Sequence, residues 1–307
     1  MKYLLLFTML FIGCADNSEK VITIERKDLI PEGIAIGPEG EIYLSCLHTK
    51  NIIRTNADGS DPQVIETEYT GRFSGVGITV VDNKIFALGN NEEGGYNSVL
   101  QIIDKESGEL IAGYELSDTI RSFYNDLAVS DVGEVFVTNS DKHAIHTLSH
   151  FTLSNFLVSE EIEYPNGIAI SDDNSKLYIA SFRKGIRILD LETKEFLNEA
   201  DSTGLTWGID GMKFYENSLI GIQNASRNRE KHSIVRFYLN ERGTEIIKAD
   251  TLIANHSTFN IPTTLDIKDA WVYCLANSQL ENLNQETMEL IRPEELTNTY
   301  ILKFRLK

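Results

Sequence analysis

Four oxygen-bearing residues occupy the same position in a repeated sequence pattern. Each stands directly before a short apolar segment: Glu32, Asn125, Asn166 and Asp210. Two carboxylates and two amides are hard oxygen donors, which favour calcium over zinc. If they converge, the two carboxylates would repel each other in an empty site, and a divalent cation would neutralise both. The pattern therefore predicts a metal site for calcium, with manganese or magnesium as alternatives.

The segments that carry these residues recur six times along the chain. Each copy has an apolar segment, a polar turn and a second apolar segment with an aromatic residue, as in residues 33–36, 38–40 and 42–44. The copies begin at Gly33, Gly77, Asp126, Gly167, Gly211 and Thr264. Successive copies start 44, 49, 41, 44 and 53 residues apart. These intervals suit a four-stranded propeller blade, which has about 40 to 50 residues.

The repeat predicts an all-β fold, a single six-bladed β-propeller over residues 21–307. Short alternating apolar runs are broken by turn residues, and no long stretch has a helical period. Residues 21–25 precede the first copy and residues 299–306 follow the last, so we expect both to pair in one blade and close the ring. The first strand of each blade then lines the central channel, and the four oxygen-bearing residues lie at its mouth. The remaining two mouth positions hold Val76 and Thr263.

Each of these polar positions also has a local explanation. Pairs such as Asn166-Gly167 and Asp210-Gly211 are typical of turns, and any one of them alone indicates a turn. Their recurrence at one position of the repeat favours a shared site. A cation that only stiffens the propeller satisfies the same pattern.

Four motifs in this order resemble those of the senescence marker protein and gluconolactonase family, whose six-bladed propellers are similar in plan to the paraoxonases. The motifs are Pro31-Glu32-Gly33, Phe123-Tyr124-Asn125-Asp126, Tyr164-Pro165-Asn166-Gly167-Ile168 and Ile209-Asp210-Gly211-Met212. The resemblance implies calcium held by Glu32, Asn125, Asn166 and Asp210, and hydrolysis of small-molecule lactones or related esters. It also implies that Asp210 acts as general base, with Asp126 as a second candidate, while the metal stabilises the developing oxyanion.

One position departs from the pattern of that family. Its sugar-lactone hydrolases often carry an arginine two residues before the position of Asn125, where this chain has Phe123, with Arg121 two residues further off. An apolar lactone or ester is therefore as plausible a substrate as a sugar lactone. The same departure favours the alternative function, a non-catalytic propeller that binds a ligand or partner around a structural calcium. The catalytic histidines of the paraoxonases have no matching position.

Charge and missing motifs exclude several other functions. Acidic residues number 46 against 28 basic ones, a formal charge of −18 that repels nucleic acids and anionic membrane surfaces. The chain has no G-x-S-x-G, no H-E-x-x-H and no pair of C-x-x-C motifs. We therefore expect no nucleic-acid partner, and we expect a monomer.

The N-terminus predicts export. Lys2 and an apolar run over residues 3–12 lead to Phe11-Ile12-Gly13-Cys14, which resembles the lipobox of bacterial lipoproteins. Residues 1–14 are then a signal peptide with its lipobox cysteine, Cys14 is the lipidation site, and residues 15–20 are a short linker. The mature chain would be lipid-anchored in the bacterial cell envelope, on the periplasmic side or at the cell surface, with the anchor as its only membrane contact. A plain signal peptide with a coincidental cysteine is the alternative.

The remaining cysteines and histidines do not form a site in the sequence. Cys46 and Cys274 lie in strand-like runs, where either two buried thiols or a disulfide is expected. His143, His146 and His150 follow a strand signal, and three-residue spacing on a strand does not bring their rings to one face. We interpret them as surface or blade residues.

Two polar segments are expected to be solvated loops. They are the acidic run around Glu160 and Glu161, and residues 224–232. The second is long enough to overhang the channel mouth and shape a pocket there.

Overall fold

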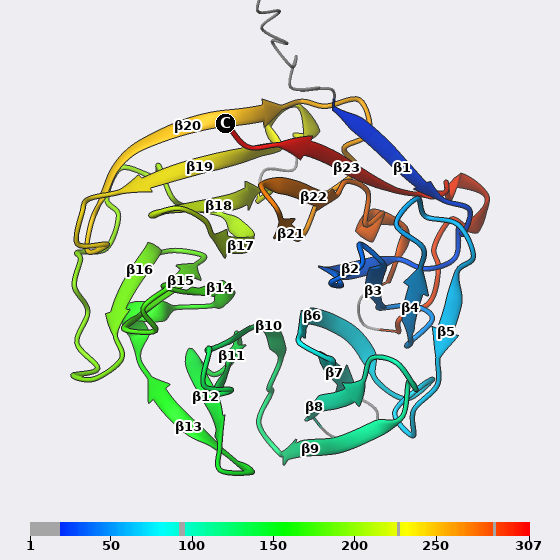
Figure 1. Ribbon diagram of the computed structural model, residues 1–307, viewed down its shortest axis with the longest axis horizontal. Helices are drawn as coiled ribbons and strands as arrows, with labels where there is room; N and C mark the ends of the chain where they lie inside the picture. The colour runs from blue at the N-terminus through cyan, green and yellow to red at the C-terminus, as the bar shows by residue number, and fades with distance from the viewer. Residues whose placement is uncertain (1–18, 92–95, 226–227, 285–286) are drawn as a thin grey trace, which may run out of the picture.

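The computed structural model describes residues 19–91, 96–225, 228–284 and 287–307. Within these ranges the regular structure is β-strand apart from short 3-10 turns, and the strands form six sheets around a central axis (Figure 1). The prediction of an all-β, six-bladed propeller is confirmed. No helix in the described ranges is long and apolar enough to cross a membrane. The predicted signal peptide, residues 1–14 with Cys14, and most of the linker lie outside the described residues.

The blades follow one another along the chain, each running from an inner to an outer strand. The first three blades are β2 (Pro31–Ile36), β3 (Ile42–Cys46), β4 (Ile52–Thr55) and β5 (Gln63–Ile65); β6 (Ser74–Val81), β7 (Lys84–Asn91), β8 (Tyr96–Asp104) and β9 (Leu110–Asp118); and β10 (Tyr124–Val129), β11 (Val135–Asn139), β12 (Ala144–Ser149) and β13 (Thr152–Val158). The next two are β14 (Pro165–Ile170), β15 (Lys176–Ser181) and β16 (Gly185–Asp190); and β17 (Ile209–Phe214), β18 (Ser218–Gln223), β19 (Ser233–Leu239) and β20 (Ile246–Ala254). The sixth is β21 (Leu265–Lys268), β22 (Trp271–Leu275), β23 (Thr299–Arg305) and β1 (Lys20–Ile24). Four 3-10 turns lie in the connections: η1 (Glu160–Ile162), η2 (Arg229–Lys231), η3 (Leu280–Asn282) and η4 (Pro293–Glu295).

The ring closes through its two ends. Strand β1 pairs antiparallel with β23, with Ile22 opposite Ile301, and the two strands lie side by side in Figure 1. Inner strands contact one another around the channel, and β21 contacts β2 to complete the circle. The predicted pairing of the terminal segments is therefore confirmed. Closure pairs the edge that β1 would otherwise expose.

The fourth blade differs from the predicted four-stranded plan, because it has three strands. A side chain takes the place of the missing strand along the edge of β16. Asn198 accepts a hydrogen bond from the amide of Ile188 and donates one to the carbonyl of Ile186, both at 2.8 Å. The amide of Leu197 donates to the carbonyl of Ile188 at 2.8 Å. The edge of β16 is thus saturated by the irregular segment that leads to β17.

The apolar core is divided among the contacts between neighbouring blades. Separate buried clusters join each adjacent pair of sheets, as Tyr43 and Ile85 do between the first two blades and Ile188 and Phe237 between the fourth and fifth. Burial of this kind contributes about 25 cal/mol per Å² of apolar surface. The packing holds the inner strands in fixed positions around the channel.

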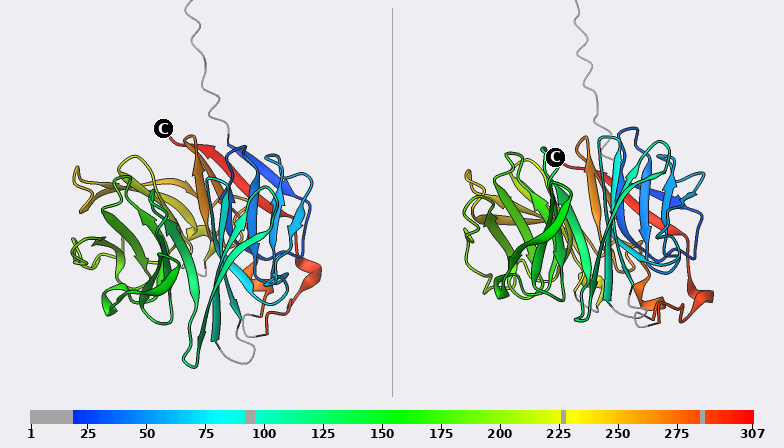
Figure 2. Two further views of the ribbon diagram at one scale, coloured as in Figure 1. Left: turned by 60° about the horizontal axis from the view of Figure 1, so that its bottom comes forward. Right: turned by 90° about the horizontal axis from the view of Figure 1, so that it is seen from below.

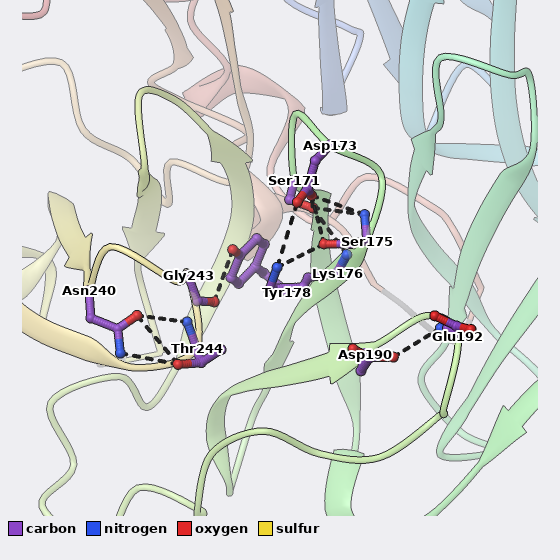
Figure 3. Close-up of polar contacts among 10 residues, drawn as sticks. All are labelled: Ser171, Asp173, Ser175, Lys176, Tyr178, Asp190, Glu192, Asn240, Gly243 and Thr244. Atoms are coloured by element: carbon purple, nitrogen blue, oxygen red, sulfur yellow. Dashed lines mark hydrogen bonds and ion pairs between the residues drawn. The ribbon is translucent and has the colours of Figure 1, made fainter.

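Polar turns close the hairpins at the end of the propeller where the inner strands finish (Figure 3). Asp173 accepts hydrogen bonds from the hydroxyl of Ser171 at 2.5 Å and the amide of Ser175 at 3.1 Å, and these bonds lower its pKa. Asn240 accepts one from the amide of Thr244 at 2.9 Å. Such side chains satisfy backbone donors that the turn leaves unpaired.

The structure resolves the open alternative for the cysteines. Cys46 and Cys274 are both buried free thiols, and burial raises the pKa of Cys46 to about 12. His146 is a buried blade residue that contacts the hydroxyl of Tyr124 at 2.9 Å. His143 contacts Glu160 at 3.1 Å. Nowhere in the described ranges do three or more His, Cys, Asp or Glu side chains form a metal cluster.

Candidate metal centre at the channel mouth

Each of the four predicted ligands is the second residue of an inner strand. Glu32 lies in β2, Asn125 in β10, Asn166 in β14 and Asp210 in β17. The pairing of all four strands with their neighbours shifts register at this position. A β-bulge of this kind re-aims a side chain that regular pairing would hold against the sheet. The bulges are the local reason that these four side chains occupy equivalent positions at the channel mouth.

The glycines that follow the ring positions allow the inner strands to approach closely. A Cβ atom on Gly77 would lie 2.7 Å from the carbonyl oxygen of Asn125, which no real side chain tolerates. Gly33, Gly167 and Gly211 meet the backbone of the next inner strand in the same way. The recurrent glycine of the repeat is therefore a packing requirement of the narrow channel.

Asp210 is buried and Glu32 is half-buried, and each has one buried oxygen that lacks a partner. Glu32 Oε2 and Asp210 Oδ1 have no hydrogen-bond partner among the described residues. Burial raises the pKa of Glu32 well above its usual range, and the nearby carboxylates of Asp210 and Asp126 raise it further. Burial also raises the pKa of Asp210 to about 7, although the amides of Asn224 and Asn166 oppose the change. Two uncompensated carboxylates in one buried place are what a divalent cation would stabilise.

Asn125 presents its oxygen because its nitrogen is already engaged. Asn125 donates from Nδ2 to the hydroxyl of Ser140 at 3.1 Å, and Ser140 donates to the carbonyl of Pro165 at 2.6 Å. The side chain of Asn166 lies close enough to Asp210 to oppose the rise in its pKa. Asn125 is thus linked through Ser140 to the next blade, and both amides can offer a carbonyl oxygen as a ligand.

Asn224, which sequence reasoning assigned to a solvated loop, belongs to this centre. It directly follows β18, and its Nδ2 donates to Asp210 Oδ2 at 2.5 Å and to the carbonyl of Pro262 at 2.7 Å. The prediction was wrong for this end of residues 224–232, because the residue leaves the second strand of its blade beside the inner strand. His232, at the other end of the segment, is also buried. No local sequence signal separates Asn224 from the polar residues that follow it.

The two remaining mouth positions cannot supply charge. Val76 is buried in the cluster between the second and third blades. Thr263 donates its hydroxyl to the carbonyl of Glu32 at 2.9 Å. A cation bound by the four oxygen residues would therefore complete its shell with water or substrate.

A second layer of charge lies just beyond the mouth. Asp126 accepts hydrogen bonds from the amides of Leu127 and Ile168, at 2.9 and 3.3 Å, so it braces two blades and does not face the mouth as a free base. Asp266 accepts one from the amide of Ile36 at 2.7 Å. Burial raises the pKa of both carboxyls, and the ammonium of Lys213 opposes that change in both. Lys213 is thus the counter-charge of this layer.

The inner strands approach closely at this second layer. Asp126, Lys213 and Thr264 line a cavity there that is too small to hold a water molecule.

Comparison with solved structures identifies the architecture. No family model and no curated protein sequence matches the chain. The likeness is one of fold. Regucalcin from Agrobacterium tumefaciens, titled a calcium-binding protein, is 15% identical with a TM-score of 0.60, over 94% of this chain and 95% of its own.

Two further structures of the same fold carry different activities. The PQQ-bound aldose sugar dehydrogenase of Streptomyces coelicolor is 11% identical with a TM-score of 0.63, over 94% of this chain and 98% of its own. Virginiamycin B lyase from Staphylococcus aureus, solved as an inactive variant with quinupristin, is 14% identical with a TM-score of 0.63, over 94% and 99%. At such identities the likeness establishes the propeller and leaves the chemistry to the residues of the site.

Phe123 and Arg121 lie in different surroundings in the structure. Phe123 is partly buried and packs against the cluster between the second and third blades. Arg121 is exposed and pairs with Asp141 at 3.1 Å. The position at which the resemblance leads us to expect an arginine is thus apolar here.

Proposed function

We propose that the chain is a calcium-dependent hydrolase of lactones or related esters. The observation that carries the proposal is the pair of buried, unpartnered oxygens, Glu32 Oε2 and Asp210 Oδ1, in a ring completed by Asn125 and Asn166. Two negative charges and two amide oxygens match the hard donors that calcium takes. The fold shared with a calcium-binding regucalcin supports the same assignment.

The chemistry follows from what each residue offers. Bound calcium supplies Lewis-acid stabilisation of negative charge on the carbonyl oxygen of the substrate. Asp210 is the proposed general base, because Asn224 fixes its Oδ2 and leaves Oδ1 directed away from that bond. It accepts a proton from the attacking water, the ester C–O bond breaks, and the proton passes to the departing alkoxide to give a hydroxy acid.

The experiment is a hydrolysis assay of the purified chain on sugar, aliphatic and aromatic lactones, with calcium and with a chelator. We expect calcium-dependent turnover of at least one class, and loss of at least 100-fold in kcat for Asp210→Asn. Thermal unfolding of the same samples separates folding from activity. At calcium a hundredfold above Kd we expect about 2.7 kcal/mol of stabilisation. Absence of that increment in the wild type would overturn the metal assignment.

The same assay also tests the alternative function, a non-catalytic propeller with a structural calcium. Stabilisation by calcium without turnover of any class would assign the ring a structural role, in a propeller that binds a ligand or partner at its mouth. The apolar Phe123 in place of an arginine is the observation that favours this alternative.

We further propose that the protein is a monomer tethered to the cell envelope through lipid on Cys14. The motif Phe11-Ile12-Gly13-Cys14 supports the tether. Strand β1 begins at the end of the propeller away from the channel mouth, while the connection between β22 and β23 projects at the mouth end (Figure 2). A tether there would turn the mouth away from the membrane. Incorporation of labelled palmitate that is abolished by Cys14→Ser tests it, and equal labelling of the variant would contradict it.

A further inference from the structure

Three aromatic side chains lie half-exposed on connections at the mouth end of the propeller. Tyr164 precedes β14, Phe182 follows β15 and Trp207 precedes β17, with exposed fractions of 42%, 47% and 48%. Tyr164 and Trp207 are two and three residues before the ring residues Asn166 and Asp210. We call these three side chains the aromatic rim. Large aromatic groups gathered beside a polar centre are typical of ligand sites.

The connections that carry the rim are bonded to one another. The amide of Phe182 donates to the carbonyl of Tyr164 at 3.3 Å. Across the next gap, the amide of Ile186 donates to the hydroxyl of Thr206, the residue before Trp207, at 3.1 Å. The amide of Asn224 donates to the carbonyl of Gly208 at 3.3 Å, which ties the same connection to the residue that holds Asp210. The connections that carry the rim are therefore tied to those that carry the oxygen ring.

The first part of the rim is held rigidly. Tyr164 adopts a positive φ of 49° that non-glycine residues seldom take. Its ring makes an edge contact with His143, with centroids 4.8 Å apart, and Arg183 lies over it at 5.8 Å. Arg183 also pairs with Glu163 at 3.3 Å, so its charge is already balanced.

Trp207 is fixed by its own turn. Its Nε1 donates to the carbonyl of Asp201 at 2.8 Å, which occupies the polar atom of the indole. Asp201 in turn accepts from the amides of Thr203 and Thr206, both at 2.7 Å. Gln223 donates to the carbonyl of Leu205 at 2.9 Å. What remains exposed is the apolar face of the ring, held in place before any ligand arrives. Such preorganisation lowers the entropic cost of binding.

We propose that the aromatic rim binds an aromatic or alicyclic ring of the substrate, while its ester carbonyl meets the oxygen ring. The inference rests on the proposed function and specifies its substrate class. The indole nitrogen of Trp207 is engaged within the protein, and Phe182 has no polar side-chain group, so both offer an apolar surface and no partner for the hydroxyls of a sugar. Phe123 in the neighbouring connection adds to the apolar character of this side of the mouth.

The kinetic experiment compares 3,4-dihydrocoumarin, δ-valerolactone and glucono-δ-lactone, with Trp207→Ala and Phe182→Ala as variants. We expect each variant to raise KM for dihydrocoumarin about tenfold, with kcat unchanged and KM for δ-valerolactone within about twofold of wild type. Phe151→Ala is the matched control, because Phe151 is an aromatic residue 88% exposed in the turn between β12 and β13, at the opposite end. Equal losses on all three lactones, or a wild type that prefers the sugar lactone, would overturn the proposal.

A binding measurement separates this inference from the hydrolase assignment. Chroman keeps the ring pair of dihydrocoumarin and lacks the ester, so it reports on the rim without turnover. The chain has two tryptophans, and Trp207→Phe identifies the emission that chroman quenches. Quenching that is lost in Trp207→Phe, with chroman affinity reduced in Phe182→Ala and retained in Phe151→Ala, would support the rim even if no lactone is hydrolysed. Chroman affinity that is unchanged by Phe182→Ala would overturn it.

Discussion

Asn224 donates a hydrogen bond to Oδ2 of Asp210 across 2.5 Å, and Oδ1 of the same carboxylate is buried without a partner. Asp210 lies in β17 and Asn224 directly follows the adjacent strand β18, and Asn224 also holds the carbonyl of Pro262 in the next connection. This bond orients the carboxylate that we propose as ligand and base. Partners that orient metal ligands commonly change affinity by 10- to 100-fold.

Removing that bond should weaken the metal site while leaving the propeller folded. We expect Asn224→Ala to raise the calcium Kd by roughly tenfold or more, measured by calorimetric titration. The protein without calcium should lose about 1 kcal/mol of unfolding free energy for the missing hydrogen bonds. Asn83→Ala serves as control, because Asn83 is bonded to Asp104 far from the mouth. Unchanged calcium affinity in Asn224→Ala would contradict its positioning role.

The buried carboxyl of Asp210 makes the calcium-free protein sensitive to pH. Its pKa lies at about 7 in the folded chain, above the ordinary value of 3.8, so the folded state binds more protons than the unfolded state between these limits. The free energy of unfolding should therefore fall as pH rises from about 4 to 7. Denaturant titrations in chelator measure this slope. Asp210→Asn removes one of the titrating groups and should reduce the slope, to which Glu32 also contributes; an equally steep curve would assign the slope to other groups.

The affinity for calcium should rise with pH, whereas the free energy of unfolding of the calcium-free protein falls. Binding requires ionised Asp210 and Glu32, so the affinity rises with pH through about 7. Titrations of calcium at several pH values, with proton release measured in buffers of different ionisation enthalpy, test this directly. Affinity that is independent of pH below 7 would argue against carboxylate ligands of raised pKa.

A change at Lys213 should affect the stability of the fold more than metal binding at the channel mouth. It opposes the rise in pKa of two carboxyls, the buried Asp126 and the half-buried Asp266. Lys213→Met leaves both without a counter-charge and should destabilise the chain by about 1 kcal/mol at neutral pH. The double variant with Asp266→Asn should regain part of that loss, because one charge is then removed. A double variant that loses the sum of the two single effects would show that Lys213 and Asp266 do not interact.

Gly77 tests the close approach of inner strands at a position that carries no ligand. A Cβ atom there would lie 2.7 Å from the carbonyl of Asn125 and 2.8 Å from Cα of Asp126. We expect Gly77→Ala to cost about 3 kcal/mol, because backbone must move on one side of the channel. Gly133→Ala is the comparison, since its Cβ meets nothing within 4 Å and only its positive φ of 84° is penalised, by about 1 kcal/mol. Equal costs for both variants would contradict a steric role for Gly77.

The sequence alone determined the propeller, its closure and the register of the ring. A blade is a local unit, so its pattern repeats every 41 to 53 residues and marks equivalent positions such as Asn166 and Asp210. The terminal segments were recognisable because they complete the last copy of the same pattern. These features depend on short-range periodicity, which a single sequence records.

Tertiary structure decided what lies across the channel and between blades. Asn224 beside Asp210, Lys213 opposite Asp126 and Asp266, and the register shifts at each ring residue depend on contacts between segments distant in the chain. The fourth blade has three strands, and side-chain bonds from Asn198 occupy the edge of β16 instead, which no strand pattern predicts. Local periodicity specifies which residues line the channel, but the partner, burial and protonation of each side chain are set by what the fold brings next to it.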